Sequence, residues 1–464
     1  MNLQDTICAL STPQGMGAIA VIRLSGAESI SILAGIFKPY GKKHKVEQAK
    51  GYTMLFGKIQ NHQHTLDEVM VGVYRAPQSY TSQDVVEINC HGSVYIQEQI
   101  IRLLLQKGAR LADPGEFTLR AYLNGKMDLS QAEGVADLIA SESEAAHQVA
   151  LQQMRGGFSN EIKGLREELI QFASLIELEL DFGEEDVEFA NRKDLQQLLE
   201  RISGLVQHLL KSYDTGNVIK NGVPVSIVGA PNAGKSTLLN ALLHEERAIV
   251  TEVAGTTRDA IEDVLMLGGI KFRFIDTAGI RETTDQVESM GIAKTFEKIA
   301  QSRAVLYLFD AANGTQNPAL IEEEISTLQE KCSGKHLFIL ANKTDVTPLE
   351  TLAAALRNQE HFYGISALRQ MGIEALTDGL LEALNLSAID TNQTIVTNAR
   401  HFHALQASRQ DIERVREGLA LNRSGDLLAF DIRAALQNLG SIIGEVDVDQ
   451  DILGNIFGKF CIGK

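Results

Sequence analysis

The sequence contains few of the residues that mark secreted or membrane proteins. It has no tryptophan and only four cysteines among 464 residues, and none of the four belongs to a CxxC pair. Scattered cysteines at this density exclude a disulfide framework and predict reduced thiols in a reducing compartment. No apolar run approaches the ~20 residues that span a bilayer, and the residues after Met1 lack the basic segment of a secretory leader. We therefore expect a cytoplasmic protein that does not associate with a membrane.

Positive charge is also scarce. The chain has 43 Lys and Arg residues against 60 Asp and Glu residues, which gives a net charge of -17. A surface of this sign does not attract nucleic acid over its whole area, so any contact with RNA must be local or shared with a partner. The hydrophobic fraction of 44% is typical of a folded chain, and the length allows roughly two to four domains.

The hydrophobic pattern divides the chain into three kinds of domain. Residues 1–123 contain short apolar runs broken by Gly and Pro, which predicts an N-terminal α+β domain. Residues 124–220 and 385–464 carry apolar residues at helical spacing, which predicts one all-α helical domain in two parts. Residues 221–384 alternate strand and helix patterns, and such alternation predicts an inserted α/β domain with a parallel sheet and helices on both faces.

Local signals refine two of these domains. In the helical domain, Ser130 and Glu133 form a capping-box pattern, which predicts a helix that runs from there toward Arg155. In the α/β domain, five apolar runs predict the strands of the sheet. These runs are residues 223–228, 272–275, 305–309, 337–340 and 362–365.

The first of these strands leads into a GxxxxGKS loop that begins at Gly229, and a helical pattern follows the loop. In such a loop, successive backbone N–H groups point inward at a helix N-terminus and bind phosphate oxygens. Lys235 can reach the β- and γ-phosphates, and the hydroxyl of Ser236 can ligate Mg²⁺. The loop therefore predicts a bound nucleoside triphosphate.

Further motifs follow this loop. The DTAG sequence at 276–279 offers a carboxylate that can hold Mg²⁺ through water and a glycine N–H for the γ-phosphate. Hydroxyls within 251–257 can complete the metal shell only when triphosphate is present. The aspartate of NKTD at 342–345 can accept two N–H groups from guanine, which adenine does not offer, and so favours GTP over ATP. Backbone groups of SAL at 366–368 are expected near the guanine O6.

Any one of these short motifs, taken alone, is more often a surface turn. Their order along the chain and their places at strand ends together favour a GTP site. The predicted GTP-binding residues are Asn232, Ala233, Gly234, Lys235, Ser236, Thr237, Thr251, Glu252, Val253, Ala254, Gly255, Thr256, Thr257, Asp276, Thr277, Ala278, Gly279, Asn342, Lys343, Asp345, Ser366, Ala367 and Leu368.

The machinery for hydrolysis departs from that of small GTPases. Ile280 occupies the position after DxxG where Ras-type proteins carry the glutamine that orients the attacking water. From the residues alone, two explanations stand equal. A monovalent cation beside the phosphates, held by the side-chain carbonyl of Asn232, can neutralise the developing charge, or a partner protein supplies the missing group. Glu282, Asp285 and Glu288 are the candidate carboxylates in the switch segment.

These motifs, together with markers elsewhere, resemble the MnmE (TrmE) family of tRNA-modification GTPases over essentially the whole chain. The markers outside the α/β domain are GAIAVIRLS at 17–25, PGEF at 114–117, NGKMDL at 124–129 and FCIGK at 460–464. The resemblance implies an N-terminal folate-binding domain that forms a homodimer, a helical domain and an inserted G domain. It also implies GTP-dependent pairing of G domains across their nucleotide faces.

The resemblance assigns roles to individual residues and favours the cation explanation. It implies that K⁺ is held by Asn232, Thr251, Val253 and Thr256, that Mg²⁺ is held by Ser236 and Thr257, and that Glu288 orients the attacking water. It further implies a heterotetramer with the flavoprotein MnmG (GidA), which modifies tRNA. The product carries a carboxymethylaminomethyl or aminomethyl group on C5 of the wobble uridine of certain tRNAs. The one-carbon unit comes from 5,10-methylene- or 5-formyl-tetrahydrofolate.

Folate contacts in the family correspond to Arg23, Glu87, Lys126 and Lys464 of this chain. A carboxylate can accept two N–H groups from the amino-pyrimidine edge of a pterin, and Arg or Lys can pair with the glutamate tail. Without the resemblance these four residues do not stand out, because charged residues near strand ends are mostly solvated. Cys461 is a candidate functional thiol, although an accessible structural cysteine is the favoured interpretation, since no neighbour in the sequence obviously lowers its pKa.

Two functions of other classes stay open. A ribosome-assembly GTPase of the Era/EngA kind would carry an appended RNA-binding domain, but the sequence has neither a KH-type GxxG loop nor a basic tail. A folate-binding regulatory module whose G domain is only a switch would differ from the modification enzyme in one respect. Its tRNA modification would not fail when GTP hydrolysis fails.

Overall fold

The computed structural model describes residues 4–40, 45–61, 64–181, 192–243, 263–275, 299–384, 386, 393–421, 423–446 and 450–463. The chain divides into two compact units. The first comprises Met1–Ala136, Gln153–Glu200 and Ala407–Lys464, and the second comprises Asp137–Gln152 and Arg201–Gln406.

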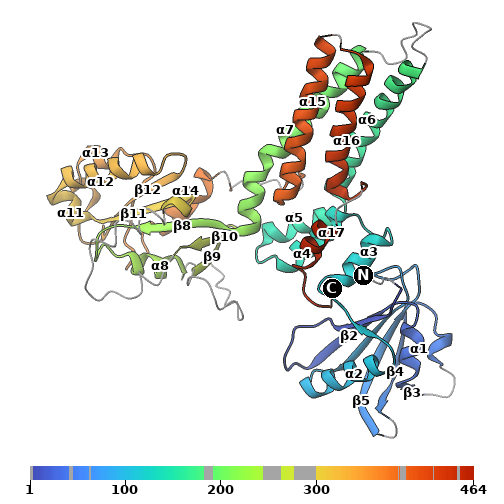
Figure 1. Ribbon diagram of the computed structural model, residues 1–464. Coiled ribbons are helices and arrows are strands. Elements are labelled where there is room, and N and C mark those ends of the chain that lie inside the picture. The colour runs from blue at the N-terminus through green and yellow to red at the C-terminus, as the bar shows by residue number, and fades with distance from the viewer. Residues whose placement is uncertain are drawn as a thin grey trace. The chain divides into compact units, whose positions relative to one another are not determined.

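The first unit contains a seven-stranded sheet in the order β3-β4-β5-β6-β2-β1-β7 (Figure 1). Its strands are β1 (Ile7–Leu10), β2 (Ile19–Ser25), β3 (Phe37–Pro39), β4 (Thr53–Asn61), β5 (His64–Tyr74), β6 (Val85–His91) and β7 (Arg110–Leu111). All pairs are antiparallel except β1 and β7. Alternate residues of the strands point to one face of the sheet, where they pack in one hydrophobic core with the apolar residues of α1 (Ser29–Ala34) and α2 (Val94–Gln106). The short 3₁₀ helix η1 (Val46–Gln48) lies between β3 and β4. The predicted α+β class of this region is confirmed.

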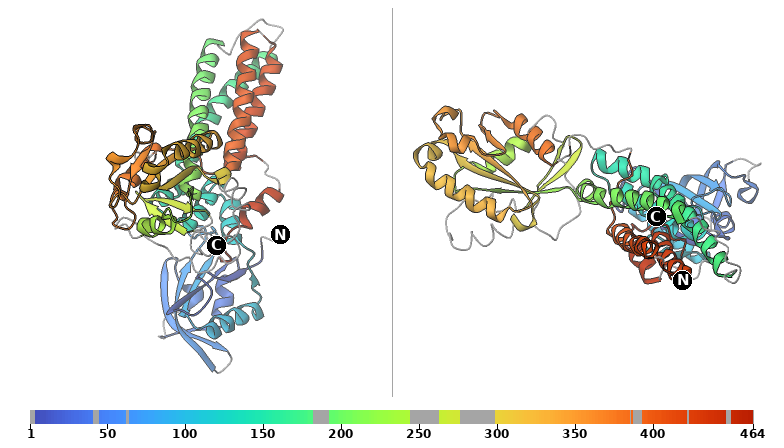
Figure 2. Two further views of the ribbon diagram at one scale, coloured as in Figure 1. Left: turned by 90° about the vertical axis from the view of Figure 1, so that its left-hand side faces the viewer. Right: turned by 90° about the horizontal axis from the view of Figure 1, so that it is seen from above.

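The helices within residues 116–221 and 399–457 range from 8 to 30 residues, and their apolar residues recur at helical spacing, as the sequence predicts. They are α3 (Glu116–Leu123), α4 (Leu129–Ala140), α5 (Glu144–Met154), α6 (Gly157–Asp181), α7 (Arg192–Asn221), α15 (Ala399–Ala420), α16 (Gly425–Ile443) and α17 (Gln450–Phe457). Figures 1 and 2 show α6 and α16 lying side by side. An ion pair of 2.6 Å between Arg433 and Glu177 joins these two helices at the surface.

The predicted helix from Ser130 toward Arg155 is wrong in two respects. The helix begins at Leu129, because Asp128 and Gln131 form the capping box. Each of their side chains accepts the backbone N–H of the other residue at 3.0 Å. The helix also ends at Ala140, and a second helix begins at Glu144, where the Ser143 hydroxyl accepts the N–H of Ala146 at 3.2 Å.

The second unit contains a six-stranded sheet in the order β13-β12-β11-β8-β10-β9. Its strands are β8 (Val223–Val228), β9 (Asp263–Leu267), β10 (Ile270–Phe274), β11 (Ala304–Asp310), β12 (His336–Asn342) and β13 (Phe362–Gly364). Five strands are parallel, and β9 is an antiparallel edge strand. The sequence-based prediction of a parallel sheet is confirmed, although it missed β9.

Helices cover both faces of this sheet. On one face, α8 (Lys235–Leu243) and α14 (Ile373–Ala383) pack against apolar residues of β8, β11 and β12. On the other face, α12 (Pro318–Lys331) and α13 (Ala354–Arg357) pack against alternate residues of the same strands. Two short elements, α11 (Ala311–Gln316) and η2 (Leu349–Thr351), complete the described part of the domain. None of the helices in the described ranges is long and apolar enough to cross a membrane.

Candidate functional site

The GxxxxGKS loop joins the carboxyl end of β8 to the start of α8. Gly229 is required there, because a Cβ on this residue would lie 2.0 Å from the carbonyl oxygen of Leu308. Asn232 and Gly234 both have positive φ, 64° and 101°, which turns the backbone inward before α8 begins at Lys235. The ammonium of Lys235 donates to the loop carbonyls of Gly229 at 2.7 Å and Ala230 at 2.9 Å. The predicted strand, loop and helix are therefore in place, with Ser236 and Thr237 in the first turn of α8.

The buried side chain of Asn342, the first residue of the NKTD motif, connects the phosphate loop to the segment at 366–368. Asn342 is the last residue of β12 and is 3% exposed. Its amide nitrogen donates to the Ala233 carbonyl at 2.8 Å, and its amide oxygen accepts the N–H of Ala367 at 3.0 Å. Motifs more than 100 residues apart thus meet at the carboxyl edge of the sheet, where ligands of α/β proteins bind.

The rest of the base-reading motifs lies at the same edge. Lys343 has a φ of 66°, and its ammonium donates to Asp310 at the end of β11, at 2.7 Å. Asp345 and Leu368 are exposed, whereas Ser366 is fully buried and its hydroxyl accepts the N–H of Arg369 at 3.2 Å. The predicted residues at 251–257 and 276–279, and the carboxylates Glu282, Asp285 and Glu288, lie outside the described residues.

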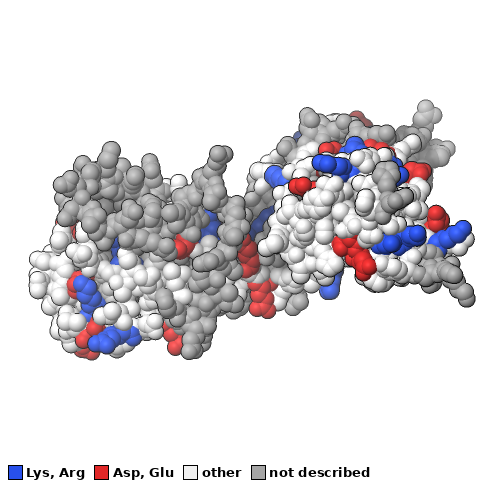
Figure 3. Space-filling view, turned by 90° about the horizontal axis from the view of Figure 1, so that it is seen from below, with Lys and Arg blue, Asp and Glu red and all other residues white. Residues whose placement is uncertain are grey.

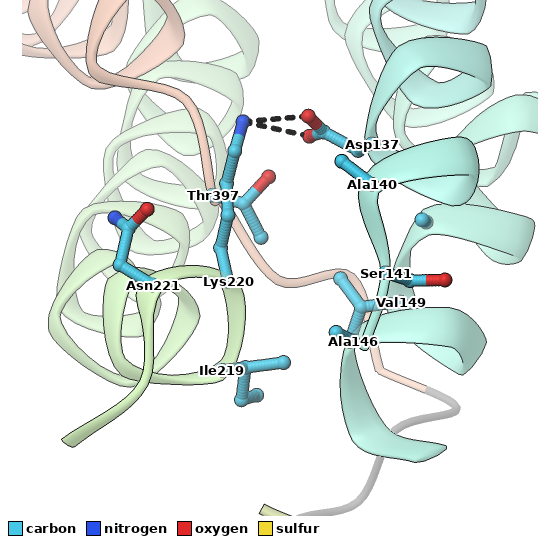
Figure 4. Close-up of a pocket in the computed structure, with 10 residues that line it drawn as sticks. Asp137, Ala140, Ser141, Ala146, Val149, Ile219, Lys220, Asn221 and Thr397 are labelled. Atoms are coloured by element: carbon cyan, nitrogen blue, oxygen red, sulfur yellow. Dashed lines mark hydrogen bonds and ion pairs between the residues drawn. The ribbon is translucent and has the colours of Figure 1, made fainter. Parts of the chain in front are cut away.

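The second unit also has a small cavity of about 130 Å³ away from this loop (Figure 4). The ammonium of Lys220 bridges both carboxylate oxygens of Asp137 at 2.7 and 2.8 Å, and apolar side chains such as Val149 line the opposite wall. The buried hydroxyl of Thr397 has no hydrogen-bond partner among the described residues.

The loop, the NKxD motif and their connection through Asn342 define the class of this protein. It is a P-loop GTPase, because the GxxxxGKS loop, the NKxD motif and the segment at 366–368 meet at the carboxyl edge of a parallel sheet.

Comparison with known proteins narrows this class. Residues 6–126 match the family described as "GTP-binding protein TrmE N-terminus", and residues 129–461 match the "MnmE helical domain". The chain is 55% identical to the tRNA modification GTPase MnmE of Christiangramia forsetii, over 100% of both chains. It is 56% identical to that of Flavobacterium johnsoniae over 99% of both, and 51% identical to that of Bacteroides fragilis over 99% of this chain and 100% of that one. The chain belongs to the MnmE (TrmE) family of tRNA modification GTPases.

Two of the four predicted folate residues meet in the first unit. Arg23 on β2 and Glu87 on β6 are directly opposite one another in the sheet. Both guanidinium contacts, at 2.8 and 3.0 Å, go to the same carboxylate oxygen of Glu87, Oε1. The guanidinium also lies over the rings of Tyr80 and Phe117, 5.2 and 5.7 Å from their centroids. These contacts fix the arginine at the sheet surface while its side chain stays partly exposed.

The other oxygen of Glu87 faces a tyrosine that the sequence-based prediction missed. The hydroxyl of Tyr74 donates to Glu87 Oε2 at 3.4 Å. Burial and the Glu87 carboxylate raise the pKa of Tyr74, so its hydroxyl keeps its proton. Gly72 on β5 lies opposite Glu87, and a Cβ there would approach Tyr74 Oη to 3.2 Å and Met54 Sδ to 3.3 Å. The side chains of Tyr74 and Met54 therefore cover position 72 beside Glu87.

The C-terminal segment is attached to this same unit. Phe457 and Phe460 pack into an apolar cluster with α3 and α4. The carbonyl of Gly463 accepts the hydroxyl of Ser11 at 3.1 Å, and a Cβ on Gly463 would lie 2.2 Å from the carbonyl oxygen of Leu10. Cys461 is exposed, and Lys464 lies outside the described residues. Lys126 is exposed beyond the end of α3.

A buried charge network fixes α3 beneath Arg23. Glu116 is fully buried, and its carboxylate accepts hydrogen bonds from Arg110 at 2.7 Å and Arg120 at 2.8 Å. Asp5 accepts from the same two arginines at 2.7 and 2.6 Å. The hydrogen bond from Arg110 lowers the pKa of Asp5. Burial acts to raise the pKa of Glu116, but the arginines outweigh it and the pKa is lowered. Both carboxylates are therefore ionised at neutral pH.

Proposed function

We propose that this chain is a K⁺-stimulated GTP hydrolase that, with the flavoprotein MnmG, adds a carboxymethylaminomethyl or aminomethyl group to C5 of the wobble uridine of certain tRNAs. A tetrahydrofolate derivative supplies the one-carbon unit. The observation that carries the proposal is the double hydrogen bond of Asn342 to Ala233 and Ala367. It joins phosphate and base recognition in a chain of the MnmE family.

The donor atoms near the loop suit the two proposed cations. Asn232 adds a side-chain carbonyl at a left-handed position of the loop, and K⁺ and Mg²⁺ both prefer oxygen ligands. Ser236 offers a hydroxyl in the first turn of α8, as a Mg²⁺ ligand of P-loop proteins does. We propose Asn232 with Thr251, Val253 and Thr256 for K⁺, and Ser236 with Thr257 for Mg²⁺. Bound cations would neutralise charge that develops on the phosphates.

Glu288 is proposed to orient the attacking water, because Ile280 has no group that can do so. The remaining predicted GTP-binding residues are proposed to hold GTP in place through their backbone and side-chain groups. We predict GTP turnover much faster in KCl than in NaCl at equal ionic strength, and loss of this difference in Asn232→Ala. Equal rates of GTP hydrolysis by the wild-type chain in both salts would show that K⁺ does not stimulate the reaction.

The arrangement around Glu87 supports a folate site. Because both Arg23 contacts use Oε1, Oε2 has only the long contact with Tyr74 among the described residues. A carboxylate oxygen in this state can accept N–H groups from a flat amino-pyrimidine ring. Tyr74 and Met54 lie over Gly72 beside this carboxylate, so a larger residue at position 72 would displace them. Lys126 and Lys464 are proposed to pair with the glutamate tail, and Cys461 is a possible functional thiol of the same C-terminal segment.

An exposed apolar surface supports the proposed homodimer through the N-terminal domain. The face of β4 and β5 that α1 and α2 leave uncovered exposes Met54, Phe56 and Met70, with exposed fractions of 40 to 53%. Ile19 on β2 and Tyr52 before β4 are exposed as well. Neighbouring apolar side chains of this size on one sheet face are typical of an interface between protein chains. A second copy of this domain is the proposed partner, and G domains are proposed to pair when GTP is bound.

Binding of tRNA is proposed to depend on the partner MnmG. On the face of the molecule shown in Figure 3, the Lys and Arg side chains of the described surface are interspersed with Asp and Glu. With a net charge of -17, this surface suits weak and salt-sensitive binding of tRNA by the chain alone. We expect the affinity to rise when MnmG is added. Tight, salt-insensitive binding by the isolated chain would contradict this part of the proposal.

A contact inside the second unit supports coupling of GTP hydrolysis to chemistry elsewhere. The turn of the β9–β10 hairpin touches the start of α5, where Ala145 N–H donates to the Gly269 carbonyl at 3.3 Å. Lys271 on β10 forms an ion pair with Glu142, just before α5. In the sequence this hairpin lies between the two predicted switch motifs. We propose that the hairpin conveys the state of the nucleotide to the helical segment at 142–145.

A further inference from the structure

We propose that Asp310 is a positioning residue for guanine-nucleotide binding, which acts by holding the side chain of Lys343. The inference rests on the class of P-loop GTPase and does not depend on the folate, MnmG or cation proposals. Asp310 belongs to none of the nucleotide motifs, and its role follows from its place beside them.

Asp310 is the last residue of β11 and lies directly opposite Asn342 in the parallel pair of β11 and β12. Its two carboxylate oxygens have different partners. Oδ1 accepts the N–H of Ala312 at 2.9 Å and so caps α11, whereas Oδ2 accepts the ammonium of Lys343 at 2.7 Å. One carboxylate therefore links the end of β11 to the second residue of the NKTD motif.

The backbone at Lys343 is held in an unusual conformation. Its φ of 66° lies in the left-handed region that non-glycine residues rarely adopt, and such positions persist only where the surroundings fix them. The Lys343 carbonyl accepts the N–H groups of Val346 and Thr347 at 3.0 and 3.1 Å. Backbone hydrogen bonds thus fix the main chain, and the contact with Asp310 fixes the end of the side chain.

The ordered side chain matters because lysine is flexible. A free lysine must lose much rotamer freedom when its stem packs against a ligand, and ordering it beforehand lowers this cost. The pair is only partly buried, with exposed fractions of 43% for Lys343 and 30% for Asp310, so it adds little to stability. Its effect should appear in nucleotide affinity, since Lys343 belongs to the NKTD motif that is predicted to read the base.

The competing role for Asp310 is purely structural, as the cap of α11. Asn and Ser both serve as helix caps, so Asp310→Asn and Asp310→Ser keep the cap and remove the charge that holds Lys343. Asp310→Ala removes both. If Asp310 only caps α11, Asp310→Asn and Asp310→Ser should bind nucleotide like the wild type, and only Asp310→Ala should differ. If Asp310 also holds Lys343, all three variants should bind nucleotide more weakly.

The experiment measures GDP affinity, KM and kcat for GTP, and the thermal midpoint of the full chain. We expect Asp310→Asn and Asp310→Ser to melt near the wild type and to bind GDP ~3-fold more weakly, as for loss of a partly exposed charge pair. KM should rise with little change in kcat, and the difference in affinity should shrink in high salt because the pair is screened. Asp310→Ala should lower the melting temperature as well.

A double-mutant cycle with Lys343→Met shows whether Asp310 acts through Lys343. We expect Asp310→Asn to have no further effect on GDP affinity in the Lys343→Met background. Wild-type affinity in Asp310→Asn, or the same loss in both backgrounds, would overturn the proposal. If only Asp310→Ala differs from the wild type, the residue is a helix cap and nothing more.

Discussion

The connection made by Asn342 leads to a quantitative prediction. Replacing Asn342 with Ala leaves the Ala233 carbonyl and the Ala367 N–H without their partner in a site where Asn342 itself is 3% exposed. Each buried polar group left unpaired costs about 1–3 kcal/mol. With two such groups, the free energy of the closed arrangement of the two loops should be roughly 2–6 kcal/mol less favourable in the variant. Part of this cost is avoided in the free protein if the two loops move apart, and it returns when nucleotide binding brings them together again.

The assay is GDP binding by the full chain, followed with a fluorescent nucleotide. If only 2 kcal/mol must be restored on binding, Kd rises about 30-fold, because each 1.4 kcal/mol is a factor of ten. We therefore expect a Kd for Asn342→Ala at least ~30-fold above that of the wild type. A thermal melt on the same samples should show a lower midpoint for the G domain.

Asn358→Ala is the matched control, since it removes an exposed asparagine from the same domain. It should leave both the Kd and the melting temperature unchanged. A Kd for Asn342→Ala within threefold of the wild type would refute the reasoning. It would mean that the loop at 229–235 and the loop at 366–368 hold their positions without Asn342.

Three further predictions address other parts of the molecule. Glu116→Gln should destabilise the first unit by about 3 kcal/mol at pH 7, as for a broken buried ion pair. The folded pKa of Glu116 is lowered, so the difference in thermal stability between the wild type and Glu116→Gln should be constant above pH ~4.3. It should become smaller as the pH falls below this value. A difference that grows in acid would contradict the ion-pair explanation. Gly72→Val should displace Tyr74 and Met54 beside Glu87 and so weaken tetrahydrofolate binding at least ~10-fold, about 1.4 kcal/mol, with GTP turnover unchanged. Unaltered folate affinity by calorimetry would argue against a folate site beside Glu87. Lys271→Glu and Glu142→Lys should each lower the amount of tRNA modified per GTP hydrolysed by up to ~5-fold. This factor corresponds to the free energy that a partly exposed ion pair contributes, up to about 1 kcal/mol. The double reversal should restore the yield, and a double variant no better than either single one would count against the hairpin as the route of coupling.

The fold class was predictable because strand and helix patterns in the inserted domain are strong. Runs such as 305–309 are continuous and apolar, as expected for parallel strands buried on both faces. The edge strand β9 was missed although the sequence carried a signal for it. Gly268 and Gly269 form a two-residue turn with positive φ at both positions, between two apolar runs.

The nucleotide motifs were predictable because their geometry is local, but the connections between them were not. Asn342 was expected to contribute to base recognition, whereas its bond to Ala233 depends on how β8 and β12 are placed in the sheet. Asp310 did have a signal, since it directly follows the predicted strand at 305–309 and so falls at the ligand edge. Pairings such as Gly72 with Glu87 depend on strand register, which the pattern of single strands does not specify.

The direct test of the central claim is the amount of modified wobble uridine in tRNA, measured by mass spectrometry. The reaction contains this chain or its Glu288→Ala variant, together with MnmG, GTP, K⁺ and the folate donor. Binding of GTP by the variant is checked beforehand, so that only hydrolysis differs between the two samples. We expect modified uridine with the wild-type chain and background levels with Glu288→Ala. Undiminished modification by a variant that binds GTP and does not hydrolyse it would show that modification does not need hydrolysis and that the G domain is only a switch.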